Sequence, residues 1–224
     1  MPNYNELKGN NLNFSIEKNK PNILKGKTLL FLGASFTYGH ASFGESFVEY
    51  IEVRNDCTCI KEAVSGTTLV EHIEDSYITR LKKVPLGKKY DALLCQLSSN
   101  DVRLKQEFGV IKESDYDTKT ICGAIQYIAK YARDVLKCPV IFYTCPYFDK
   151  ERYQKLVSIL NEIATKMQFS VIDMYNDKNF NNISAETYAL YMADPVHPTK
   201  AGYYFWLTPY IESHLFAFFT KLIR

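Results

Sequence analysis

The chain has 224 residues, 46% of them hydrophobic, and its 27 basic and 25 acidic residues leave a formal net charge of +2. This length and composition fit one globular domain with a substantial core. No basic stripe interleaved with aromatic residues stands out, which argues against nucleic acid as a partner. No apolar run precedes Lys25, and no stretch approaches the roughly 18 apolar residues of a membrane helix, so we expect a cytoplasmic protein without a signal peptide or membrane insertion.

Residues 1–24 are polar and rich in Asn and Lys, and we expect them to form an N-terminal extension to a single domain at residues 25–224. The domain opens with the continuous apolar run Thr28–Leu32, which is typical of a strand buried on both faces. Strand and helix patterns then alternate. In chain order we predict a helix at 45–54, a strand at 57–64, a helix at 67–84 and a strand at 90–97.

The second half of the chain continues this alternation after a polar loop at 98–116. Asp117 is expected to cap a helix that extends to Val135. A strand at 139–145, a helix at 156–167, a strand at 169–174 and an Asn-rich loop at 176–183 follow. A C-terminal helical region begins after Pro198, and Pro209 should kink or restart it.

The alternation predicts an α/β fold, in which a parallel sheet lies between helices in a three-layer α/β/α sandwich with right-handed crossovers. In sheets of this kind the functional site lies beyond the carboxyl ends of the strands. Ser35, Gly66 and Asn100 each come just after a predicted strand, and we therefore expect them to lie close together.

These residues, with Asp194 and His197, have the chemistry needed for acyl transfer through a serine ester. A serine hydroxyl becomes a nucleophile when a neighbouring base takes its proton. His197 is the candidate base, and Asp194, three residues before it, is the candidate carboxylate that orients its ring. Singly, Ser35 also fits a phosphate-binding turn or a plain loop, and the Asp194–His197 segment also fits a surface loop that caps a helix.

Three groups are candidate donors to an oxyanion: the backbone N–H groups of Ser35 and Gly66 and the side-chain amide of Asn100. Taken alone, Gly66 and Asn100 are also ordinary turn residues. We interpret Asp101 as an acceptor that fixes its loop. His40 and Arg103 are candidate substrate-binding residues at the edges of the pocket, although Arg103 equally fits a solvated surface position.

The remaining patterns predict neither a metal nor a cofactor. The histidines form no spaced set with cysteines or carboxylates, and the Gly33-Ala34-Ser35 turn lacks the glycine pattern of nucleotide-binding loops. The six cysteines are expected to be buried free thiols. Cys57 and Cys59, with one residue between them, make a poor redox motif and a poor zinc half-site.

In their order along the chain, Ser35, Gly66, Asn100 and His197, with Asp194 before the last, resemble the four blocks of the SGNH hydrolase superfamily, also called GDSL-type esterases and lipases. The resemblance spans residues 33–197. It implies a flavodoxin-like five-stranded sheet in the order 2-1-3-4-5, no cofactor, and a Ser35 acyl-enzyme with a Ser-His-Asp triad and three oxyanion donors.

Two positions depart from the usual pattern of that superfamily. Ala34 stands where the family usually has an aspartate that braces the loop, and Ser98 stands where it usually has glycine. Neither change removes a catalytic group. We therefore expect an ester hydrolase that acts on a small-molecule substrate with a small or medium acyl group, with an acetyl group on a carbohydrate as one option. An acyltransferase with the same acyl-enzyme and a non-catalytic acyl- or carbohydrate-binding module are the alternatives.

Overall fold

A computed structural model of the chain describes residues 3–223. In it, parallel strands form one sheet in the order β2-β1-β3-β4-β5, as the resemblance implied. The strands are β1 (Thr28–Gly33), β2 (Thr58–Ala63), β3 (Ala92–Gln96), β4 (Val140–Tyr143) and β5 (Ser170–Ile172).

The apolar strands are buried, and the strand with charged residues is more exposed. β1, β3 and β4 are almost continuously apolar and lie in the core, whereas the edge strand β2 carries Lys61 and Glu62 and is only half-buried. Continuous apolar strands are typical of a parallel sheet that helices cover on both faces.

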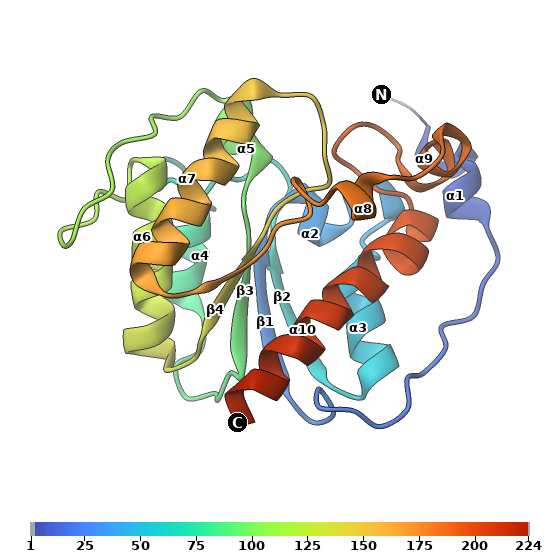
Figure 1. The fold of residues 1–224 in the computed structure, drawn as a ribbon, viewed down its shortest axis with the longest axis horizontal. Coiled ribbons are helices and arrows are strands. Elements are labelled where there is room, and N and C mark those ends of the chain that lie inside the picture. Colours follow the sequence, from blue (N-terminus) through green and yellow to red (C-terminus); the bar gives the residue numbers. More distant parts are fainter. Residues whose placement is uncertain (1–2, 224) are drawn as a thin grey trace.

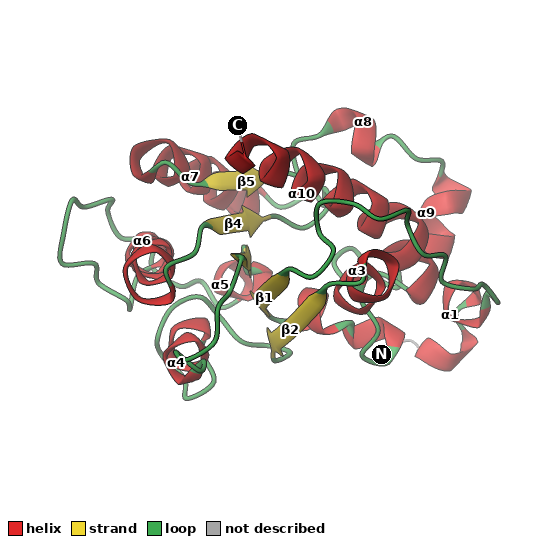
Figure 2. Cartoon of the chain, turned by 90° about the horizontal axis from the view of Figure 1, so that it is seen from below, coloured by secondary structure: helices red, strands yellow, loops and turns green. Residues whose placement is uncertain are grey.

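Helices cover both faces of this sheet (Figures 1 and 2). On one side lie α3 (Phe47–Asn55) and α10 (Thr208–Ile223), and on the other α4 (Tyr77–Lys83), α6 (Ile121–Tyr131) and α7 (Glu151–Met167). The predicted three-layer α/β/α sandwich is confirmed. No helix within residues 3–223 is long and apolar enough to cross a membrane.

Shorter helices complete the chain. Several of them lie at the end of the sheet where β1 and β3 finish, and they carry the polar motifs of the sequence (Figure 1). The shorter helices are η1 (Tyr4–Glu6), α1 (Lys8–Asn11), α2 (Ser35–Tyr38), η2 (His40–Ser42), α5 (Ser99–Arg103), η3 (Ala132–Leu136), α8 (Lys178–Asn181), α9 (Ala185–Tyr191) and η4 (Gly202–Leu207).

The predicted helix at 67–84 is wrong over its first half, because only Tyr77–Lys83 is helical. Residues 67–76 form an irregular segment that we call the 67–76 segment. The prediction rested on the helical spacing of Leu69, Ile73, Tyr77 and Leu81, but Ile73 is exposed, and the backbone N–H groups of Leu69 and Val70 donate to Asp101 at 2.8 and 3.2 Å instead of to helix carbonyls.

Other helix boundaries also differ from the prediction. Thr120, and not Asp117, caps α6 by accepting the N–H of Gly123 at 3.3 Å. The predicted loop at 98–116 opens with α5, and the Asn-rich loop at 176–183 contains α8, which Asp177 caps. Near Pro209, a π-helical turn (η4) changes into α10 at Thr208, which is the expected restart of the helix.

The described part of the extension, residues 3–24, packs against the domain. Leu24 is fully buried in the core, and the Asn19 amide donates to Asn55 and Glu212 at 2.9 and 3.2 Å. All six cysteines are free thiols; five are buried and Cys59 is half-buried.

Candidate active site

The turn after β1 presents Ser35 at the start of α2. Gly33 is required here because of a close approach: a Cβ at this position would lie 1.9 Å from the Thr37 hydroxyl oxygen. Gly33 has no positive φ, so the reason is steric crowding and not backbone conformation. The Ser35 hydroxyl is held at the surface of the core, and the residue is 8% exposed.

Gln96, at the end of β3, braces this turn. Its Oε1 accepts the N–H of Ala34 at 2.9 Å and the hydroxyl of Thr37 at 2.7 Å. Thus an amide from a neighbouring strand holds the loop that an aspartate at position 34 often braces in the superfamily. Sequence reasoning missed Gln96; the available signal was a polar residue in the otherwise apolar run 92–97.

Ser35, His197 and Asp194 form one hydrogen-bonded row, although 162 positions separate the first two in the chain. His197 Nε2 lies 2.8 Å from Ser35 Oγ, and His197 Nδ1 lies 2.7 Å from Asp194 Oδ2. The other carboxylate oxygen, Oδ1, accepts the backbone N–H groups of Val196 and His197 at 2.8 and 2.9 Å. The carboxylate therefore fixes both the loop and the orientation of the imidazole ring.

The charge state of Asp194 follows from these contacts. Burial alone would raise the pKa of Asp194, but the hydrogen bonds from the His197 ring and from the two backbone N–H groups outweigh it, and the pKa lies below its ordinary value. Asp194 is thus ionised at neutral pH and able to stabilise a protonated imidazole.

Gly66 and Asn100 lie in the same cavity as Ser35 and His197. Gly66 adopts φ +84°, a conformation that favours glycine, and nothing lies within 4 Å of where its Cβ would be. The Asn100 amide donates to the Thr67 carbonyl at 2.9 Å, and its oxygen accepts Arg103 Nε at 3.3 Å. The second N–H of this amide is not used by these two contacts. It can donate to a ligand in the cavity that Asn100 lines.

Two buried charges hold the loops of this cavity. Asp101 accepts two N–H groups of the 67–76 segment, the loop-fixing role expected for it. Arg80 was not foreseen; it is buried beside Tyr77 and Leu81 on α4 and donates to the carbonyls of Gly33 and Glu62. Arg80 therefore joins the ends of β1 and β2, which lead to Ser35 and Gly66.

The cavity around Ser35 has a volume of 790 Å³. His40 and Arg103 both line it, where their sequence positions predicted a pocket edge. Its wall also contains apolar side chains and two charged residues that sequence reasoning did not single out: Val102, Phe148, Pro195, Val196, Asp149 and Lys150. The cavity wall thus combines apolar side chains with the charged residues Arg103, Asp149 and Lys150.

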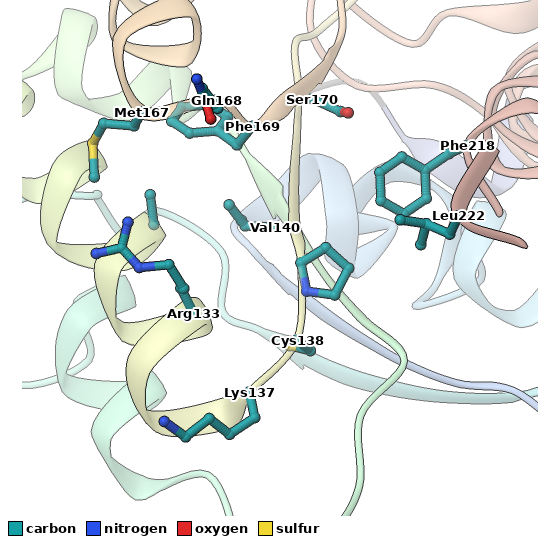
Figure 3. A pocket seen from close by; sticks show the side chains of 12 residues that line it. Arg133, Lys137, Cys138, Val140, Met167, Gln168, Phe169, Ser170, Phe218 and Leu222 are labelled. Carbon is teal, nitrogen blue, oxygen red and sulfur yellow. The ribbon is translucent and has the colours of Figure 1, made fainter. Parts of the chain in front are cut away.

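A second cavity of 470 Å³ lies at the opposite end of the sheet, where β4 and β5 begin (Figure 3). Its wall carries Arg133, Lys137, Phe218 and Leu222, but none of the predicted catalytic residues. The burial that raises the pKa of its Cys138 thiol to about 11 makes that thiol a poor nucleophile. Among residues 3–223, no three His, Cys, Asp or Glu side chains gather into a metal-ligand cluster.

Comparison with known proteins identifies the family of the chain. The family model of GDSL-like lipase/acylhydrolase matches residues 29–207. A comparison with curated proteins finds no match.

Solved structures share the fold over most of their length. A protein from Lactobacillus plantarum superposes with a TM-score of 0.73 at 17% identity, over 85% of this chain and 97% of the other. An α/β hydrolase from the metagenome of Lake Arreo, Spain, gives 0.61 at 14% identity, over 85% and 95%. An acetylxylan esterase from Geobacillus stearothermophilus gives 0.59 at 17% identity, over 85% and 94%. The family model covers most of the chain and includes every residue of the Ser35–His197–Asp194 row, and the chain therefore belongs to the GDSL-like lipase/acylhydrolase family.

Proposed function

We propose that the protein is a serine ester hydrolase that forms an acyl-enzyme on Ser35. One observation carries the proposal: Ser35 Oγ lies 2.8 Å from His197 Nε2, and the opposite ring nitrogen lies 2.7 Å from Asp194. A nucleophile within hydrogen-bond reach of a base that a third group orients is the arrangement that serine esterases need. Membership of the GDSL-like family supports a hydrolase that acts on esters.

In the first half-reaction, His197 Nε2 accepts the Ser35 proton as Oγ attacks the ester carbonyl carbon. The oxygen of the tetrahedral intermediate accepts hydrogen bonds from the N–H groups of Ser35 and Gly66 and from the Asn100 amide. The bond to the alcohol oxygen then breaks, and His197 donates its proton to the leaving alcohol. Asp194 stabilises the imidazolium throughout.

In the second half-reaction, His197 takes a proton from water, which attacks the acyl carbon. The bond between that carbon and Ser35 Oγ breaks, the carboxylic acid leaves, and His197 returns the proton to Oγ. The active site therefore ends as it began, and the net reaction is hydrolysis of one ester bond.

We place the substrate among esters of small or medium acyl groups, including acetyl esters of carbohydrates. A cavity of 790 Å³ has room for an acetyl group together with part of its alcohol. The likeness to an acetylxylan esterase supports acetylated polysaccharide as one substrate to test.

Turnover of p-nitrophenyl acetate, p-nitrophenyl butyrate and acetylated xylan by wild-type protein, Ser35→Ala and His197→Ala tests the proposal. We expect each variant to lose at least about 10³-fold in kcat while its thermal unfolding stays cooperative. A variant that keeps the wild-type rate would show that the roles are assigned wrongly. Wild-type protein that binds these esters without cleaving them would indicate a binding module, and preferential transfer to an added alcohol would indicate an acyltransferase.

A further inference from the structure

The N-terminal segment Asn3–Asn11 packs against the active-site loops, although it lies outside residues 29–207, which the family model matches. Its helix α1 contacts α9, which leads into the loop of Asp194 and His197 (Figure 1). Packing is tight, since a Cβ at Gly9 would lie 2.0 Å from the Leu190 carbonyl oxygen and 2.3 Å from the Thr199 hydroxyl. The segment therefore packs closely against α9 and against Thr199, which follows His197.

Asn10 connects three parts of the chain through one side chain. Its Nδ2 donates to the carbonyls of Tyr4 and Ala41, both at 2.8 Å, and its Oδ1 accepts the N–H of Lys200 at 2.9 Å. Both amide donors and the oxygen are thus used in bonds of good length. Ala41 belongs to η2, soon after Ser35, and Lys200 lies three residues after His197.

Aromatic rings form a second connection between the segment and the site. The Tyr4 ring meets His40 edge-on, with centroids 5.7 Å apart, and His40 lies 5.4 Å from the His197 ring. Burial, and then the negative charge of Asp194, raise the pKa of the Tyr4 phenol. The segment thus contacts His40, which lines the cavity.

We propose that Asn10 is a positioning residue that sets the distance between the loop of Ser35 and the loop of His197, and that Asn3–Asn11 is an added part of the active site. The inference rests on the proposed ester hydrolysis. Proton transfer between Ser35 and His197 depends on the separation of two loops that are far apart in sequence, and a displacement of about 1 Å in such a pair costs on the order of 10² in rate.

Asn10 is not the sole connection between these loops. The Tyr203 hydroxyl donates to the Phe36 carbonyl at 2.6 Å, and the Lys200 ammonium pairs with Glu45. The first contact is buried and independent of Asn10, so it will keep the loops near each other when Asn10 is changed. The expected effect is therefore a partial loss of rate and not its abolition.

The test is the second-order rate constant for labelling of Ser35 by a fluorophosphonate, measured with kcat and KM for p-nitrophenyl acetate. Asn10→Ala removes all three bonds. Asn10→Asp keeps the side-chain volume and the acceptor for Lys200, but it places carboxylate oxygen against the carbonyls of Tyr4 and Ala41. Asn11→Ala is the matched control, since Asn11 is exposed and its amide bonds only Asn5 and Leu7 within the segment.

We expect both Asn10 variants to lose about 10- to 100-fold in labelling rate and kcat, with KM within about twofold of wild type. Asn11→Ala should match wild type. Labelling is measured below the unfolding temperature of each variant. If Asn10→Ala does not fold, Asn10→Asp alone provides the test. A lower melting temperature with an unchanged labelling rate would overturn the inference, because Asn10 would then have a purely structural role.

The same experiment separates this inference from the proposed function. Wild-type protein labelled at Ser35, together with Asn10 variants labelled equally fast, would overturn only the role of Asn10. Wild-type protein that is not labelled would overturn both.

Discussion

At the scale of single residues, Asn100 shows how neighbouring groups orient a donor. Its oxygen accepts Arg103 Nε, and one of its N–H groups donates to the Thr67 carbonyl. A flipped amide would set oxygen against that carbonyl and N–H against Arg103, so the amide has one favourable orientation. The remaining N–H then faces the cavity by elimination. The sequence identifies Asn100 as a candidate donor, but its partners follow only from the folded chain.

Asp194 should matter through the orientation of His197, and Asp194→Asn tests this. An asparagine oxygen that accepts from the ring nitrogen would turn its NH₂ toward the N–H groups of Val196 and His197, whereas the flipped amide would donate to the ring and stabilise the wrong tautomer. Either arrangement loses bonds that the carboxylate makes. We expect kcat for p-nitrophenyl acetate to fall by up to about 10⁴, with little change in KM.

The control for this variant is Asp173→Asn. The Asp173 carboxylate accepts hydrogen bonds from the side chains of Asn161 and Asn176 and makes none with His197. Its activity should match wild type. If Asp194→Asn retained the wild-type kcat, the carboxylate would have no part in orienting the base.

At the scale of elements, the 67–76 segment shows where helical spacing misleads. Leu69 and Ile73 share the helical spacing of Tyr77 and Leu81, but in this segment the backbone N–H groups of Leu69 and Val70 donate to the Asp101 carboxylate. The carboxylate offers two backbone N–H groups a stronger acceptor than a helix carbonyl would. No local pattern in residues 67–76 reveals an acceptor 25 or more positions away, which is why the prediction failed here and succeeded for α3 and α7.

The same burial makes this segment sensitive to pH. Burial raises the pKa of Asp101 to about 6, and the N–H groups of Leu69 and Val70 only partly offset it. The folded protein therefore holds this proton more tightly than the unfolded chain, in which an aspartate titrates near 4. The contribution of Asp101 to stability is complete below about pH 4 and is lost as the pH rises through about 6, by about 3 kcal/mol.

Asp101→Asn should remove this dependence, because an amide does not titrate. Between pH 2 and pH 8, a range that spans both the unfolded and the folded pKa, the free energy of unfolding of wild type should fall relative to that of the variant by about 3 kcal/mol. Urea unfolding at a series of pH values measures the difference. Asp115→Asn, in an exposed loop, is the control and should keep the wild-type slope. Equal slopes for wild type and Asp101→Asn would show that Asp101 does not carry the effect.

At the scale of the whole molecule, the sequence was sufficient to predict that three of the four motifs lie close together. A parallel sheet puts the carboxyl ends of its strands at one edge, so Ser35, Gly66 and Asn100 had to converge once their strands were identified. The structure confirmed the layers that the alternation of strands and helices predicts and the sheet order that the family resemblance implies. The sequence did not reveal Gln96, Arg80 or Asn10, because each acts through contacts between distant segments that leave no periodic pattern.

The N-terminal extension illustrates this difference most clearly. Its polar composition predicts an arm on the domain, whereas Gly9 and Asn10 lie against the loop of His197 and Leu24 lies in the core. The segment Asn3–Asn11 lies outside residues 29–207, which the family model matches, and it packs on the active-site side of the molecule.

The central claim is that Ser35 is an activated nucleophile, and the most direct measurement is intact mass after treatment with a fluorophosphonate, with Ser35→Ala as the control. Only a serine whose proton has an acceptor reacts readily with this probe, and the natural substrate is not needed. We predict one adduct on wild-type protein and none on Ser35→Ala. Folded wild-type protein that gains no adduct, or a Ser35→Ala variant that is still labelled, would contradict the account.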